Sequence, residues 1–144
     1  MFLNTANPTV STLSQEFIAA ATGAPGWEGQ SWDSAQDVAV TTLDALIAAH
    51  GLPDFVKIDV EGHEAEVLRG LSLPLPALSF EVTTLQRDVA LACIDRLGDL
   101  PADAFGHSMS LMRRGEVFYV ADVSKLPESA AAERAEFERE ADTW

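Results

Sequence analysis

The chain has few basic residues and a single cysteine, and each scarcity excludes a class of protein. Its 144 residues contain nine Lys and Arg against 23 Asp and Glu, which gives a formal net charge of −14. This balance argues against nucleic acid or an anionic membrane as a partner, because both need clustered basic side chains to neutralise phosphates. Cys93 has no second cysteine with which to form a disulfide. We interpret it as a core thiol rather than a nucleophile.

Signals for export or membrane insertion are also missing. The N-terminus has no basic region ahead of an apolar core, and no apolar run approaches the roughly twenty residues that span a bilayer. These absences predict a cytoplasmic protein with no membrane partner. The hydrophobic content of 47% is sufficient for a core, and the length fits one ordinary domain.

The most informative segment is 55–70, where an apolar run changes into a helical pattern. Residues 55–60 are rich in β-branched side chains, which is typical of a strand buried on both faces of a parallel sheet. Gly62 breaks this run, and apolar residues then recur at helical spacing. In open α/β sheets, ligands bind outside the carboxyl ends of the strands. The turn would therefore display three polar side chains at the functional edge: Asp59, Glu61 and His63.

The remaining sequence predicts alternating helices and strands. Before the central segment we expect an extended start over 1–12, a helix over 13–21, a loop to residue 37, a strand over 38–40, and a helix capped by Thr41 or Thr42 and ended by Gly51. After it we expect a strand over 78–82, a helix over 86–97, and a hairpin formed by 105–112 and 117–121.

Several segments together resemble the FkbM family of S-adenosylmethionine-dependent methyltransferases. The family pattern is Thr-Leu-Asp-x-Leu, a spacer, Ile-Lys-Ile-Asp-Val-Glu-Gly-x-Glu, and then Val-Leu-x-Gly. The matching segments are 42–46, 56–64 and 67–70, with further matches at 78–81 and 7–14. The resemblance covers residues 3–97. It implies an α/β fold, namely the later strands and helices of a Rossmann-like class I methyltransferase sheet that ends in an antiparallel hairpin.

The first half of such a fold is not found in the sequence. It would contain a strand, a Gly-rich turn that approaches the cofactor, and a second strand ending in an acidic residue. The glycine cluster at 23–29 follows a helical pattern and reads as a loop. We expect residues 1–126 to be the C-terminal part of a methyltransferase domain and 127–144 an acidic helical or frayed tail. Either the reading frame is truncated, or another polypeptide supplies the first half.

The resemblance implies transfer of a methyl group from S-adenosylmethionine to a hydroxyl of a secondary metabolite or sugar. The protein would contribute positioning and proton removal, and a divalent metal is a possible further cofactor. The alternative is a non-catalytic remnant or an interaction half-domain that needs a partner chain. We expect a small-molecule acceptor and either a partner chain or self-association that covers an exposed sheet edge.

The resemblance also assigns roles to individual residues. Asp59 would orient the acceptor hydroxyl or hold a divalent cation, and Glu61 would share that work or simply face solvent. His63 could take a proton from the acceptor, but we favour the account in which it is simply a polar residue that starts a helix. Lys57 is interpreted as a partner for a carboxylate. Glu81 would lie near Asp59 if the two strands are parallel, as a buried or metal-linked pair or as a strand cap.

The tryptophans of the loop, Trp27 and Trp32, have two interpretations. They could line an acceptor pocket, or they could fasten the loop to the body of the protein, which is the commoner use of such residues. We favour the second interpretation.

Overall fold

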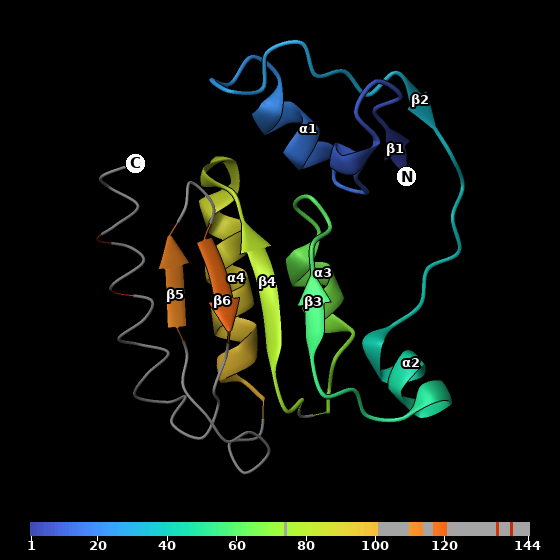
Figure 1. Ribbon diagram of the computed structural model, residues 1–144, viewed down its shortest axis with the longest axis vertical. Coiled ribbons are helices and arrows are strands. Elements are labelled where there is room, and N and C mark those ends of the chain that lie inside the picture. Colours follow the sequence, from blue (N-terminus) through green and yellow to red (C-terminus); the bar gives the residue numbers. More distant parts are fainter. Residues whose placement is uncertain (74, 101–109, 114–116, 121–134, 136–138, 140–144) are drawn as a thin grey trace.

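The computed structural model describes residues 1–73, 75–100, 110–113, 117–120, 135 and 139 (Figure 1). Within these residues the protein is of the mixed α/β class. Its elements are β1 (Phe2–Leu3), η1 (Pro8–Val10), α1 (Gln15–Ala21), β2 (Ser34–Ala35), α2 (Leu43–His50), β3 (Val56–Ile58), α3 (Glu64–Arg69), β4 (Leu78–Val82), η2 (Thr84–Gln86), α4 (Arg87–Gly98), β5 (Ser110–Arg113) and β6 (Val117–Val120). None of the described helices has the length and apolar character needed to cross a membrane.

The main sheet has the strand order β3-β4-β6-β5. Strands β3 and β4 are parallel, and Ile58 is paired with Phe80. Strand β6 runs antiparallel to both of its neighbours. The predicted hairpin is confirmed as β5 and β6, while its ends at 105–109 and 121 lie outside the described residues. So does the predicted boundary at residue 126, and only residues 135 and 139 of the tail are described.

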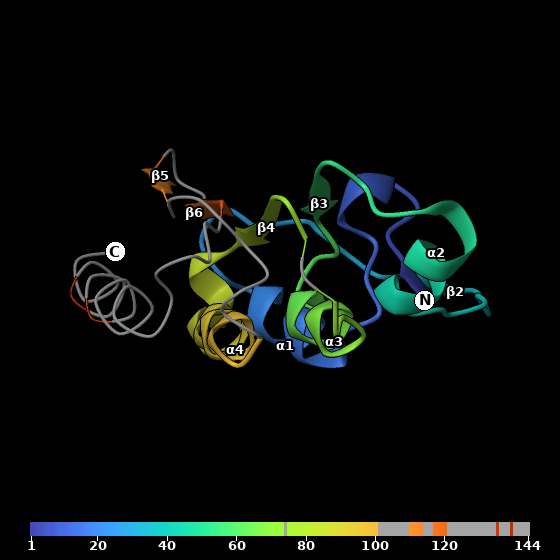
Figure 2. The ribbon, with the colours of Figure 1, turned by 90° about the horizontal axis from the view of Figure 1, so that it is seen from below.

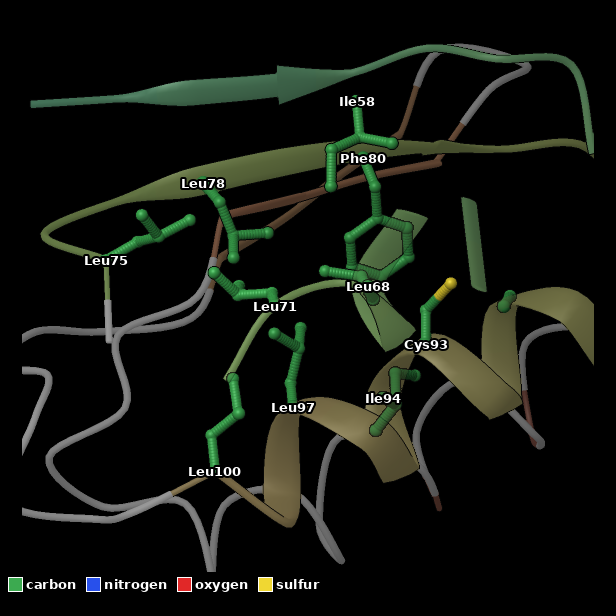
Figure 3. Packing of buried hydrophobic residues seen from close by; sticks show 11 residues of the cluster. Ile58, Leu68, Leu71, Leu75, Leu78, Phe80, Cys93, Ile94, Leu97 and Leu100 are labelled. Atoms are coloured by element: carbon green, nitrogen blue, oxygen red, sulfur yellow. The ribbon is translucent and has the colours of Figure 1, made fainter. Parts of the chain in front are cut away.

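The core lies between the sheet and helices α3 and α4, which cover one of its faces (Figure 2). Figure 3 shows Ile58 and Phe80 of the strands directed toward the helical layer, where Leu68 and Leu97 are also buried. Burial of each large apolar side chain contributes about 1.5–3 kcal/mol. Cys93 lies in this cluster with no exposed surface, and its burial raises the pKa of the thiol. The expectation of a core thiol is confirmed.

Strand β3 differs from its prediction, because only one of its faces is buried. Ile58 is 3% exposed, whereas Phe55 on the alternate face is 51% exposed and the side chain of Lys57 is 56% exposed. Successive strand residues point to opposite faces, and α3 and α4 cover only the face of Ile58. The sequence of an apolar, β-branched strand does not show whether one or both of its faces will pack against other elements.

The N-terminal region forms a separate layer, in which α1 lies beyond the carboxyl ends of β3 and β4 (Figure 1). Ser14 caps α1 because its Oγ accepts a hydrogen bond from the N–H of Phe17 at 3.0 Å. The fully buried ring of Phe17 makes edge-to-face contacts with Trp27 and Trp32, at centroid distances of 5.1 and 5.9 Å. Both tryptophans therefore fasten the loop to α1, as expected.

The predicted strand over 38–40 is wrong. Residues 36–42 have no regular secondary structure, and Val40 is 75% exposed. A strand needs a neighbour for its backbone groups, and no described strand pairs with this segment. The pairing occurs earlier in the chain, where β2 is antiparallel to β1. The predicted extended start over 1–12 is correct only in part, because it contains β1 and then the 3₁₀ turn η1.

Helix α2 has the predicted ends. Thr42 is the N-cap and its Oγ1 accepts a hydrogen bond from the N–H of Ala45 at 3.1 Å, and Gly51 ends the helix with φ 91°. Asp44 in the first turn accepts two hydrogen bonds from Ser72, one from the N–H at 2.9 Å and one from the hydroxyl at 2.6 Å. Asp44 thus connects α2 to the segment that follows α3.

Candidate active site

Three carboxylates meet at the carboxyl ends of the two parallel strands. Asp59 directly follows β3, and Glu81 is the residue after Phe80 in β4, so the register places them side by side. Glu61 extends back toward them from the turn. One oxygen of each side chain lies within 4.8 Å of the others. The structure therefore brings together three of the five residues that the sequence singled out.

The fourth residue, Lys57, forms an ion pair with Asp59. The pKa of Asp59 lies below its usual range, first because of a hydrogen bond with the Glu81 side chain and second because of the Lys57 ammonium. With its pKa lowered, the Asp59 carboxylate can accept a hydrogen bond from a hydroxyl.

The fifth residue, His63, lies outside this cluster. It is the N-cap residue of α3, but its side chain makes no capping hydrogen bond. It lines a groove of about 370 Å³ bounded by α1, α3 and α4, together with Ser14, Arg69 and Asp88. The structure thus separates the only imidazole of the predicted site from the three carboxylates.

The turn that carries Glu61 has an unusual backbone. Glu61 has φ 50° and is the only residue other than glycine with a positive φ in the described part of the chain. Gly62 follows with φ 86°, and a Cβ there would lie 2.0 Å from Oε1 of Gln86 and 2.8 Å from Cβ of Phe17. Position 62 therefore requires glycine both for its conformation and for the close approach of α1 and η2.

Two buried residues that the sequence did not single out contact this turn. Glu64 is 4% exposed, and its Oε1 accepts hydrogen bonds from the N–H groups of Val60 at 3.3 Å and Gly62 at 3.2 Å. Thr12 is 2% exposed and donates its hydroxyl to the carbonyl of Glu61 at 2.6 Å. Glu64 had a signal, since it is the last acid of the matched motif. Thr12 lies in the matched segment 7–14, but nothing in the sequence predicts its contact with a partner 49 residues away.

A hard divalent cation could be held by oxygens of Asp59, Glu61 and Glu81, since such ions prefer carboxylate ligands. Glu61 and Glu81 also border a cavity of about 10 Å³, close to the volume that one water molecule needs. Gln86 lines the same cavity, and its Oε1 is buried without a hydrogen-bond partner.

The described residues fit a divalent cation better than they fit an adenosyl cofactor. Gly23, Gly26 and Gly29 have positive φ values in the loop after α1, and nothing lies within 4 Å of a Cβ added at any of them. They serve turns rather than close approach to a bound molecule. Among the described residues, no Gly-rich turn joins a strand to a helix.

A comparison with protein families identifies the class of this protein. Residues 4–115 match the methyltransferase FkbM domain. The match covers most of the chain, and the protein belongs to the FkbM methyltransferase family. The resemblance carried by the sequence motifs is thereby confirmed, and membership implies methyl transfer in general. Among curated proteins and solved structures, nothing matches the chain.

Proposed function

We propose that the chain supplies the acceptor side of an S-adenosylmethionine-dependent methyltransferase that acts on a hydroxyl of a secondary metabolite or sugar in the cytoplasm. The observation that carries this proposal is the convergence of Asp59, Glu61 and Glu81 at the carboxyl ends of β3 and β4. Ligands of open α/β sheets bind at this edge. In the main sheet, β3 and β4 are parallel, and β6 lies between β4 and β5 and is antiparallel to both. This order supports the proposal that the sheet is the later part of a Rossmann-like sheet.

Asp59 acts mainly by orienting the acceptor in this proposal. Its lowered pKa makes it a weak base, so holding the hydroxyl in line contributes more than removing its proton. Glu61 and Glu81 complete the acidic edge, and Lys57 balances part of its charge. S-adenosylmethionine, when bound, would supply the methyl group. A divalent cation held by the same carboxylates would orient the hydroxyl instead, and then turnover would fall on addition of a chelator.

The proposal is tested by Asp59→Asn in a form of the enzyme that binds S-adenosylmethionine. The change keeps the shape of the side chain and removes its charge, so we expect turnover to fall by about 10²-fold or more while the melting temperature changes by only a few degrees. Asp54→Asn is the matched control, because Asp54 is exposed and lies before β3. If turnover and melting temperature fall together in Asp59→Asn, or if neither changes, Asp59 has no role in catalysis. A non-catalytic module would show no transfer at all.

A further inference from the structure

The peptide bond between Glu61 and Gly62 is held at both of its polar ends. Its carbonyl accepts the hydroxyl hydrogen of Thr12 at 2.6 Å, and its N–H is donated to the carboxylate of Glu64 at 3.2 Å. The N–H of Val60, two residues before Gly62, is donated to the same Glu64 oxygen at 3.3 Å. Three backbone polar groups of the turn are therefore bound by two side chains, both of them buried.

The two side chains come from different parts of the fold. Glu64 is the first residue of α3, directly after the turn. Thr12 belongs to the N-terminal layer, where its own backbone is paired with Phe2 in both directions at 2.7 and 3.0 Å. Its hydroxyl also accepts a hydrogen bond from the N–H of Ser14 at 2.9 Å. This second contact fixes the direction in which the hydroxyl hydrogen points, namely toward Glu61.

The conformation held in this way is one that glutamate seldom adopts. A positive φ at a residue with a Cβ is unfavourable and persists only when its surroundings impose it. Rotation about the N–Cα bond of Glu61 to a negative φ would relieve this strain. Because that rotation turns the 61–62 peptide, it would break the hydrogen bonds of its carbonyl to Thr12 and of its N–H to Glu64. It would also change the direction of the Glu61 side chain, which now places an oxygen within 4.8 Å of Asp59 and Glu81.

We propose that Thr12 and Glu64 are positioning residues that lock the Glu61–Gly62 peptide and so hold the acidic edge in one arrangement. Neither residue is expected to touch the acceptor. Their importance for turnover depends on the proposed methyl transfer, whereas the lock itself is a property of the turn. Through Thr12 the N-terminal layer becomes part of the site, although it contributes none of the three carboxylates.

The lock is tested by the pair Thr12→Val and Thr12→Ser, with amide hydrogen exchange of Gly62 followed by NMR. Valine has the shape of threonine without the hydroxyl, and serine keeps the hydroxyl. Thr12 does not touch the N–H of Gly62, so a purely local effect would leave the exchange of this group unchanged. We expect the exchange rate of the Gly62 N–H to rise about tenfold in Thr12→Val and to stay within about twofold of the wild-type rate in Thr12→Ser. Unchanged exchange in Thr12→Val, or equal effects of both variants, would overturn the proposal.

Glu64 provides an independent comparison if Thr12→Val does not fold. Glu64→Gln keeps an oxygen that can accept both N–H groups, and Glu64→Met removes it at similar volume. We expect the Gly62 N–H to stay protected from exchange in Glu64→Gln and to exchange about tenfold faster in Glu64→Met. In an active form of the enzyme, turnover should fall with the loss of protection while the acceptor KM changes little. An enzyme without methyl transfer would refute the proposed function and leave the exchange test intact.

Discussion

At the level of single residues, Glu64 combines a buried carboxylate with two backbone hydrogen bonds. Its burial raises the pKa, and the negative charge of Asp59 adds to this effect, although the hydrogen bonds from Gly62 and Val60 act in the opposite direction. The folded protein therefore holds this proton more tightly than the unfolded chain. The contribution to stability is complete below the ordinary value of 4.5 and is lost as pH rises through the pKa of the folded state.

We accordingly predict a pH-dependent effect of Glu64→Gln on stability. The unfolding free energy of the wild type, minus that of the variant, should decrease as pH rises from about 4 to 7, because glutamine does not titrate. Urea unfolding at several pH values measures this difference. Glu66→Gln, which removes the same charge from an exposed position of α3, is the matched control. A difference that is constant or that increases with pH would show that Glu64 is not a destabilised buried charge.

The sequence allowed some of the site to be predicted, and the physical reason is parallel strand register. Asp59 and Glu81 each follow a similar apolar run, so parallel pairing alone places them together. Thr12 could not be predicted, because its contact with Glu61 depends on how the N-terminal layer is placed on the sheet. His63 lies at the start of α3, which agrees with its interpretation as a polar residue that begins a helix.

At the level of elements, the connection between α2 and the segment after α3 depends on one carboxylate. The hydroxyl and the N–H of Ser72 both donate to Asp44, and these bonds hold the pKa of Asp44 below its usual range, with the hydroxyl as the larger cause. A third hydrogen bond joins the N–H of Asp44 to the carbonyl of Gly70 at 3.0 Å. Asp44 is the acid of the first family motif segment, and here its role is to join two helices.

We predict that Ser72→Ala weakens this connection in a pH-dependent way. A lowered pKa stabilises the fold above the ordinary value of 3.8, and this contribution is lost as pH falls through the pKa of the folded state. The variant should therefore be less stable than the wild type near neutral pH, by a few degrees in melting temperature, and the gap should narrow below about pH 4. Thermal unfolding at several pH values measures this difference in melting temperature. Ser31→Ala, at an exposed position, is the control. A gap that is independent of pH would contradict the assigned cause.

The elements themselves were predicted best where their signals were local. Caps and stops such as Thr42 and Gly51 act within one turn of a helix, so the sequence specifies them directly. Strands depend on partners elsewhere in the chain. This is why 38–40 has the composition of a strand without being one, and why Ser34 and Ala35 form a strand without its composition.

For the molecule as a whole, the first question is whether the isolated chain binds S-adenosylmethionine. The described residues lack a Gly-rich turn between a strand and a helix. We therefore predict weak binding or none, and calorimetric titration of the 144-residue chain with the cofactor is the direct measurement. A dissociation constant in the low micromolar range would mean that the chain contains a complete cofactor site.

The second question concerns the edge of the main sheet. Strand β3 pairs with β4 on one side, and no other described strand pairs with its second edge. Of the seven large apolar residues exposed in the described part, five lie in the segment that leads to this edge: Val38, Val40, Leu46, Leu52 and Phe55. Helix α2 within this segment has no buried residue. An open strand edge beside exposed apolar side chains favours association.

We therefore predict that the isolated chain self-associates, is partly unfolded, or needs a partner that pairs with β3. Light scattering after size-exclusion chromatography should give a mass above the 15.5 kDa of one chain, and amide exchange over residues 55–60 should be fast. Phe55→Lys should lower the mass by placing a charge at the edge. Ala19→Lys, which adds the same charge on the exposed surface of α1, should not. A monomer with slow exchange throughout 55–60 would show that β3 closes its second edge within the chain, and that no partner strand is needed.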